Sequence, residues 1–179
     1  RHLVTQGHME LLGLIEHVDA SELEGGTQLS LAQLQGEILA LLGRLDEAEA
    51  LLQTALKSAE KSADVLVQAE LLSSLADVSR KQGNSDLSLN RHKKALRHYI
   101  ALANARWASR TYNNIGYLLR RKNERAKALE AYGEVEAILS TSNDDGLISS
   151  QITLARALID LGEVDRARDH AMSSHERTS

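Results

Sequence analysis

The sequence has 179 residues, of which 42% are hydrophobic and 26% charged, and its formal net charge is −4. It contains no cysteine, which excludes disulfides, thiolate chemistry and cysteine-ligated zinc, and no apolar run approaches the roughly 18 residues of a membrane-spanning helix. We therefore expect a cytoplasmic protein without a membrane anchor. Proline is also absent while leucine and alanine dominate, and this composition favours helices.

The N-terminal residues differ in character from the rest of the chain. Residues 1–8, which end in Gln6-Gly7-His8 before Met9, have the pattern of a protease site and cloning remnant, and we interpret them as vector-derived. Residues 9–26 are predicted to form a partial repeat or capping helix, amphipathic over 9–18, followed by a loop at Glu24-Gly25-Gly26.

From residue 27 onwards the sequence repeats with a period of about 40 residues. Turn residues recur at Gly43, Gly83, Asn123 and Gly162, with spacings of 40, 40 and 39. A small residue lies seven positions before each turn and another lies five positions after it. Small side chains let two antiparallel helices approach closely, so we predict repeat-packing roles for Gly36, Ala48, Ala76, Ser88, Gly116, Ala128, Ala155 and Ala167.

The turns divide the chain into helices whose first residues are acidic or capping. Asp46-Glu47 and Asn84-Ser85-Asp86 follow the first two turns, and negative or capping side chains are favourable at a helix N-terminus. The sequence therefore predicts helices at about 28–42, 45–61, 65–82, 85–103, 106–122, 125–140, 146–161 and 164–175.

This pattern resembles the tetratricopeptide repeat, most clearly in "YNNIGYLLRRKNERAKALEAY" of the third repeat. The repeat is longer than the usual 34 residues and lacks the closing proline, as in the long-repeat subclass that includes kinesin light chain. The resemblance implies an all-α, right-handed superhelical solenoid of antiparallel helix hairpins, with about four repeats and a partial N-terminal one. The hairpins would span about 29–68, 69–108, 109–147 and 148–179, within 27–179.

The resemblance also implies a concave groove, lined by the first helix of each hairpin, that binds a protein or peptide. Residues 65–127 carry 13 basic and 4 acidic side chains, whereas both flanking regions are acidic. Every aromatic residue lies between Tyr99 and Tyr132. Because arginine and large aromatic side chains anchor protein interfaces, we predict that an acidic partner segment is bound by Arg80, Lys81, Arg110, Asn113, Tyr117, Arg120, Arg121 and Arg156.

Some of these aromatic and basic residues also fit a structural role. Tyr112 and Tyr132 occupy positions expected in the core, and Trp107 fits packing between hairpins as well as an interface. A sensor or regulatory domain of a bacterial or archaeal transcription regulator or signalling ATPase remains an alternative function. Self-association is a third, because the acidic ends could meet the basic middle of another copy.

Other classes of function fit the sequence poorly. His92 and His98 are six residues apart, whereas a helical metal pair needs three or four, so we predict no metal site. No glycine-rich phosphate loop and no distinct acid–base pair is present, and we therefore predict neither a cofactor nor an enzyme. The chain as a whole is acidic, with a pI of about 6.0, which disfavours nucleic acid as a partner.

Overall fold

The computed structural model describes residues 2–18, 23–142 and 147–176, and within these ranges it contains helices and no strands. The all-α helical-repeat prediction is therefore confirmed, and the predicted helices occur in the predicted order. The chain forms two compact units, Arg1–His98 and Tyr99–Ser179, and the boundary between them falls inside a helix.

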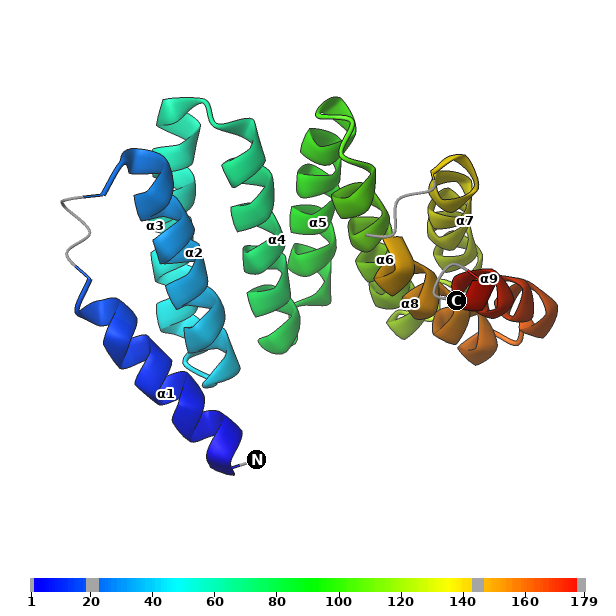
Figure 1. Ribbon diagram of the computed structural model, residues 1–179, viewed down its shortest axis with the longest axis horizontal. Coiled ribbons are helices and arrows are strands. Elements are labelled where there is room, and N and C mark those ends of the chain that lie inside the picture. Colours follow the sequence, from blue (N-terminus) through cyan, green and yellow to red (C-terminus); the bar gives the residue numbers. More distant parts are fainter. Residues whose placement is uncertain (1, 19–22, 143–146, 177–179) are drawn as a thin grey trace. The chain divides into compact units, whose positions relative to one another are not determined.

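The first unit contains α1 (His2–Glu16), α2 (Gly25–Leu41), α3 (Leu45–Ser62), α4 (Val65–Lys81) and most of α5 (Ser85–Ala101). α2 and α3 form a helical hairpin, and α4 packs against both of them (Figure 1). α1 contacts α2. The leucine side chains of this unit supply its core, with Leu52, Leu71 and Leu75 almost completely buried.

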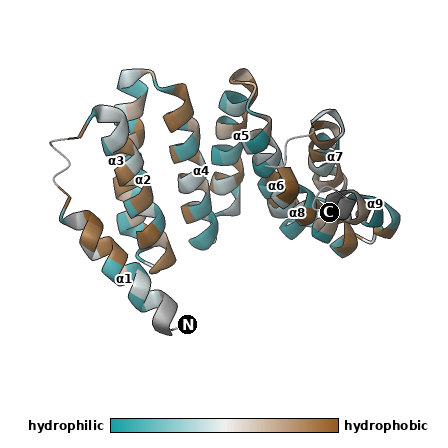
Figure 2. Cartoon of the chain, viewed as in Figure 1, coloured by the Kyte–Doolittle hydropathy of each residue, from teal (hydrophilic) through white to brown (hydrophobic). Residues whose placement is uncertain are grey.

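The second unit begins with the last residues of α5 and continues with α6 (Ala105–Arg121), α7 (Arg125–Thr141), α8 (Ile148–Asp160) and α9 (Val164–Glu176). α6 and α7 form one hairpin, α8 and α9 form the next, and α8 contacts both α6 and α7. Hydrophobic bands run along these helices between hydrophilic ones, as an amphipathic packing surface requires (Figure 2).

The turns between helices have the backbone conformation that the sequence predicts. Gly43, Gly83 and Gly162 have φ values of 82°, 85° and 79°, and Asn123 has a φ of 60°. This left-handed conformation ends a helix and is most accessible to glycine and asparagine. Three helices then begin with a side chain that accepts a hydrogen bond from the backbone N–H three residues later: Asp64 from Val67, Asn84 from Leu87 and Asn104 from Trp107.

The first two helices begin earlier than the sequence predicts. α1 starts at His2 rather than near Met9, so it includes residues interpreted as a vector remnant. The predicted loop at Glu24-Gly25-Gly26 is wrong, because α2 starts at Gly25. The two glycines lie in the first turn, where backbone N–H groups need no partner within the helix. The Gln28 side chain donates to the Leu23 carbonyl 2.9 Å away and thereby fastens the start of α2.

Two glycines mark the closest approach between the helices of a hairpin. A Cβ atom at Gly36 would lie 2.6 Å from Cγ of Leu52, and one at Gly116 would lie 2.5 Å from Cε1 of Tyr132. No side chain larger than hydrogen fits at either position without displacing a buried neighbour. The predicted packing residues Gly36, Ala48, Ala76, Ser88, Gly116, Ala128, Ala155 and Ala167 are all buried.

Candidate functional site

The predicted partner-binding residues are divided between the two units. Arg80 and Lys81 lie at the end of α4 in the first unit, and the other six lie on α6 and α8 in the second. Arg80 donates from Nε and Nη2 to Oδ1 of Asp77, at 3.3 and 3.2 Å. Lys81 donates to the Ala40 carbonyl at 2.7 Å. Both cations are therefore engaged within the first unit.

The surroundings of Lys81 lower the pKa of its ammonium group. Burial is the largest cause of the lowered pKa of Lys81. The neighbouring Arg80 guanidinium lowers this pKa further, whereas Asp77 raises it.

Asn113 of α6 lies inside the second unit rather than on its surface. Its side chain is 3% exposed, and its Nδ2 donates to the Ser150 carbonyl at 3.0 Å. The hydroxyls of Ser109 and Ser150 are joined by a second buried hydrogen bond of 2.9 Å. These two bonds tie the middle of α6 to the first turn of α8. Sequence reasoning missed Ser109 and Ser150, although they are 41 residues apart and so occupy nearly equivalent positions in successive repeats.

The end of α6 carries an arginine–tyrosine cluster formed by Tyr117, Arg120 and Arg121. The guanidinium carbons of Arg120 and Arg121 lie 5.8 and 5.9 Å from the centre of the Tyr117 ring. Arg121 also donates to the Tyr117 hydroxyl at 3.3 Å, and Arg120 forms an ion pair of 2.6 Å with Asp160 of α8. Arg120 is therefore the member of the cluster that already has a carboxylate partner.

Trp107 and Arg110 form a second aromatic–cation pair near the start of α6. The Arg110 guanidinium carbon lies 5.0 Å from the centre of the indole ring. Trp107 in turn stacks on Tyr99, with ring centres 5.9 Å apart and an angle of 16° between the planes. Tyr99 is completely buried, so Trp107 combines packing on one side with an exposed contact on the other.

The remaining tyrosines contribute to packing to different degrees. Tyr132 is buried beside Gly116, and burial raises the pKa of Tyr132 to about 12 although Arg120 lowers it. Tyr112 is half-buried, and burial also raises the pKa of Tyr112.

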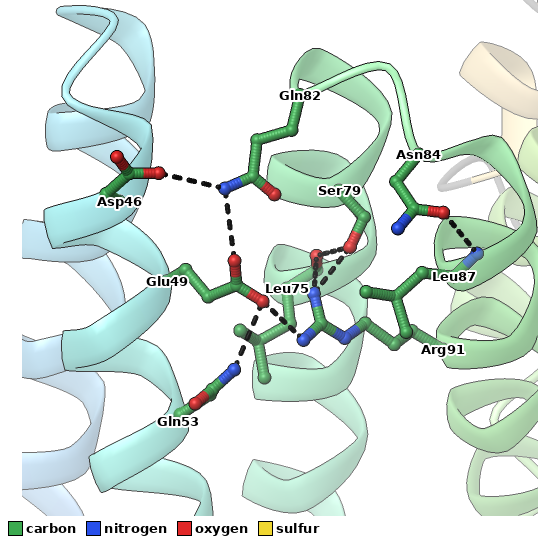
Figure 3. A network of polar contacts seen from close by, with 9 residues as sticks. All are labelled: Asp46, Glu49, Gln53, Leu75, Ser79, Gln82, Asn84, Leu87 and Arg91. Carbon is green, nitrogen blue, oxygen red and sulfur yellow. Dashed lines mark hydrogen bonds and ion pairs between the residues drawn. The ribbon is translucent and has the colours of Figure 1, made fainter.

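A polar network in the first unit was also not predicted. Arg91 of α5 forms a 2.6 Å ion pair with Glu49 of α3 and donates to Ser79 and to the Leu75 carbonyl of α4 (Figure 3). Gln82 donates to the other Glu49 oxygen at 3.0 Å. One arginine therefore links three successive helices, which is a stabilising role rather than a binding site.

Metal-binding clusters and membrane-spanning helices are both absent from the residues that the structure describes. Among residues 2–18, 23–142 and 147–176, no group of three or more histidine, aspartate or glutamate residues could hold a metal ion. In the same part of the chain, no helix is long and apolar enough to cross a membrane.

Comparisons with known proteins agree with this architecture. No curated protein matches the sequence. Among solved structures, the nearly identical TPR-like repeats ascribed to a kinesin light chain of Podosopora anserina superpose with a TM-score of 0.73, at 15% identity, over 98% of this chain and 90% of that one. BtubC (BKLC) from P. vanneervenii gives a TM-score of 0.69 at 16% identity, over 96% and 70%. MamA gives 0.56 at 17% identity, over 97% and 86%.

The sequence itself matches a defined repeat family over most of its length. Residues 27–101 and 67–141 match the tetratricopeptide repeat, and residues 148–171 match a second description of the same repeat. These ranges contain the helix hairpins, the left-handed turns and the closely packed glycines described above. The chain belongs to the tetratricopeptide repeat family.

Proposed function

We propose that this chain is a protein-interaction scaffold whose second unit binds an acidic segment of a partner protein along α6 and α8. Tetratricopeptide repeats form a class of non-enzymatic scaffolds that bind proteins or peptides, and membership of the family supports this part of the proposal. The acidic character of the partner and the position of its binding site rest on the residues of the second unit.

One observation carries the proposal. Arg110, Arg121 and Arg156 are exposed on α6 and α8, and none of them forms an ion pair with a carboxylate among the described residues. Unpaired arginines are available for bidentate contacts with the carboxylates of another protein. An acidic segment would provide these partners.

The aromatic rings beneath two of these arginines support the same conclusion. Arg110 lies over Trp107, and Arg121 lies over Tyr117. Each contact restricts a long side chain before a partner arrives, so less conformational entropy is lost on binding. Arginine and aromatic residues together are also the composition typical of interface hot spots.

Charge reversal of Arg121 and Arg156 tests the proposal. We expect Arg121→Glu with Arg156→Glu to abolish binding of a labelled glutamate-rich peptide, measured by fluorescence anisotropy, while the circular dichroism of the protein stays unchanged. Arg120 is left intact because a glutamate there would face Asp160, its ion-pair partner, and would disturb the fold.

The matched control is Lys93→Glu with Lys94→Glu, which makes the same change in net charge at two exposed residues of α5 in the first unit. Equal loss of binding in both double variants would show a general charge effect and contradict a site on α6 and α8.

The proposed partner is a different protein. We expect the two to meet in the cytoplasm, because the chain contains no cysteine. Two other partners are separate outcomes of the same assay. Displacement of the labelled peptide by random RNA at much lower concentrations than unlabelled glutamate-rich peptide requires would favour nucleic acid. A mass by light scattering that doubles at low salt would favour a second copy of the chain.

A further inference from the structure

A small polar pocket lies between the start of α6 and the start of α8 in the second unit. It has a volume of about 220 Å³, and its walls are formed by Arg106, Trp107, Arg110, Ser149 and Ser150. We call it the α6–α8 pocket. Small-molecule sites usually enclose about 300–1,000 Å³, so this pocket is closer to the size of one side chain. Among the residues that the structure describes, its walls contain no carboxylate, and two of the five lining residues are arginines.

The arginine nearest the indole is held in a defined orientation. The Arg110 guanidinium carbon lies 5.0 Å from the centre of the Trp107 ring, and Trp107 is stacked on the buried Tyr99. Contact with the ring occupies one face of the guanidinium and leaves its N–H groups, which lie in its plane, available as donors. The pocket therefore presents a cation whose position is largely fixed before a ligand binds.

The part of the pocket wall that belongs to α8 is joined to α6 by two buried hydrogen bonds. Ser109 donates to or accepts from the Ser150 hydroxyl at 2.9 Å, and Asn113 donates to the Ser150 carbonyl at 3.0 Å. Ser149 and Ser150 lie in the first turn of α8, and the N-terminal end of a helix has positive potential. The start of α8 therefore favours negative charge in the pocket, as Arg110 does.

We propose that the α6–α8 pocket binds a single carboxylate side chain of the partner's acidic segment, with Arg110 as the principal donor and Trp107 as the apolar wall. The proposal rests on the proposed function above and adds where one acidic residue is anchored. A guanidinium matches the two oxygens of a carboxylate, and the methylene groups of a glutamate can lie against the indole. The size of the pocket suits one such side chain rather than a longer peptide.

Trp107 provides a local measurement because it is the only tryptophan in the sequence. The probe is an acetylated and amidated ten-residue peptide of alternating serine and glutamate, and its counterpart has glutamine in place of each glutamate. We expect the glutamate peptide to change the emission of Trp107 in a saturable way and the glutamine peptide to leave it unchanged. A third peptide, with phosphoserine in place of glutamate, distinguishes a carboxylate site from a phosphate site.

Single substitutions then locate the site. We expect Arg110→Gln to weaken binding of the glutamate peptide, measured by anisotropy, by about 10- to 100-fold, as loss of a charged hydrogen bond does. Arg168→Gln is the matched control, because it removes the same charge from an exposed arginine of α9 that is not part of the pocket. The control should bind within about twofold of the wild type, since a distant exposed charge is screened by salt.

The outcomes separate this inference from the proposed function. If the wild type binds the glutamate peptide but Arg110→Gln binds equally well, or Trp107 emission does not respond, the pocket assignment is wrong while the acidic-partner proposal stands. If the wild type binds neither glutamate peptide nor phosphoserine peptide, both proposals fail. Binding of the phosphoserine peptide alone would overturn the carboxylate assignment.

Discussion

Gly116 and Gly133 are two helical glycines of the same hairpin with opposite roles. A Cβ atom at Gly116 would lie 2.5 Å from the buried Tyr132 ring, whereas a Cβ atom at Gly133 meets nothing within 4 Å. We expect Gly116→Ala to lower the free energy of unfolding by about 1–3 kcal/mol through overpacking. Gly133→Ala should raise it by about 0.5–1 kcal/mol, because alanine restricts the unfolded chain and favours the helix.

Urea denaturation of both variants measures these changes. The two substitutions add the same methyl group to helices in contact with each other, so each is the control for the other. Equal effects on the denaturation midpoint, in either direction, would contradict the packing described between α6 and α7.

At this scale the sequence predicted which small residues are buried, but not which polar side chains are buried or paired. The spacing from the turn residues was enough to predict a buried Gly36 and Gly116, because each repeat has the same geometry. It could not show that Asn113 is buried or that Arg120 is paired. Both depend on residues one repeat later, Ser150 and Asp160, whose side-chain directions the spacing alone does not determine.

Two helix starts in the first unit differ in how they are capped. The Asp64 side chain accepts a hydrogen bond of 3.1 Å from the Val67 N–H at the start of α4, whereas Glu24 at the start of α2 makes no such bond. We expect Asp64→Ala to lower the free energy of unfolding by about 1 kcal/mol. Glu24→Ala is the control and should change it by less than about 0.5 kcal/mol. Thermal denaturation of each variant measures these changes. Similar losses of stability in both variants would show that the Asp64 side chain contributes nothing as a cap.

The ion pair between α3 and α5 makes stability depend on pH. The hydrogen bond from Arg91 holds the pKa of Glu49 below its usual value, although burial opposes this. A carboxyl group with a depressed folded-state pKa stabilises the fold above its unfolded-state pKa, and this contribution is lost as pH falls through the folded-state pKa. The ion pair between Arg91 and Glu49 therefore contributes to the free energy of unfolding at neutral pH. This contribution decreases below about pH 4.5.

Arg91→Met tests this contribution. We expect the variant to be less stable than the wild type at pH 7 by about 1–3 kcal/mol, because Glu49 loses a charged partner. The difference should shrink as the pH is lowered from 7 toward 3, because protonation of Glu49 removes the charge that Arg91 stabilises. Denaturation curves at pH 7, 5 and 3 measure it, and a difference that is constant with pH would contradict the role given to Glu49.

The helices themselves were largely predictable, and the exceptions have a physical cause. Turn residues with a period of 40 defined the ends of most helices, because glycine and asparagine adopt the left-handed conformation most readily. The starts of α1 and α2 lie before the first such turn, where no repeat constrained the prediction. Ala63 and Ala103 also adopt left-handed turns, with φ values of 56° and 51°, and alanine gives no sequence signal for that conformation.

For the molecule as a whole, the negative net charge hides an uneven distribution of charge, and the proposed function depends on that distribution. The chain has a formal charge of −4, yet residues 65–127 contain 13 basic and 4 acidic side chains. An acidic ligand would be repelled by the average charge and attracted by Arg110 and Arg121 of α6. We therefore expect affinity for a glutamate-rich peptide to fall as salt rises from 50 to 300 mM, because exposed charges are screened over a Debye length of roughly 10 Å or less.

A calorimetric titration with the matched glutamate and glutamine peptides shows whether the scaffold binds an acidic segment because of its charge. The two ligands have the same length and nearly the same shape, so a difference between them reports the charge of the partner segment alone. We expect saturable binding of the glutamate peptide at low salt and no detectable binding of the glutamine peptide. Equal binding of both peptides, or binding of neither, would contradict an acidic partner for this scaffold.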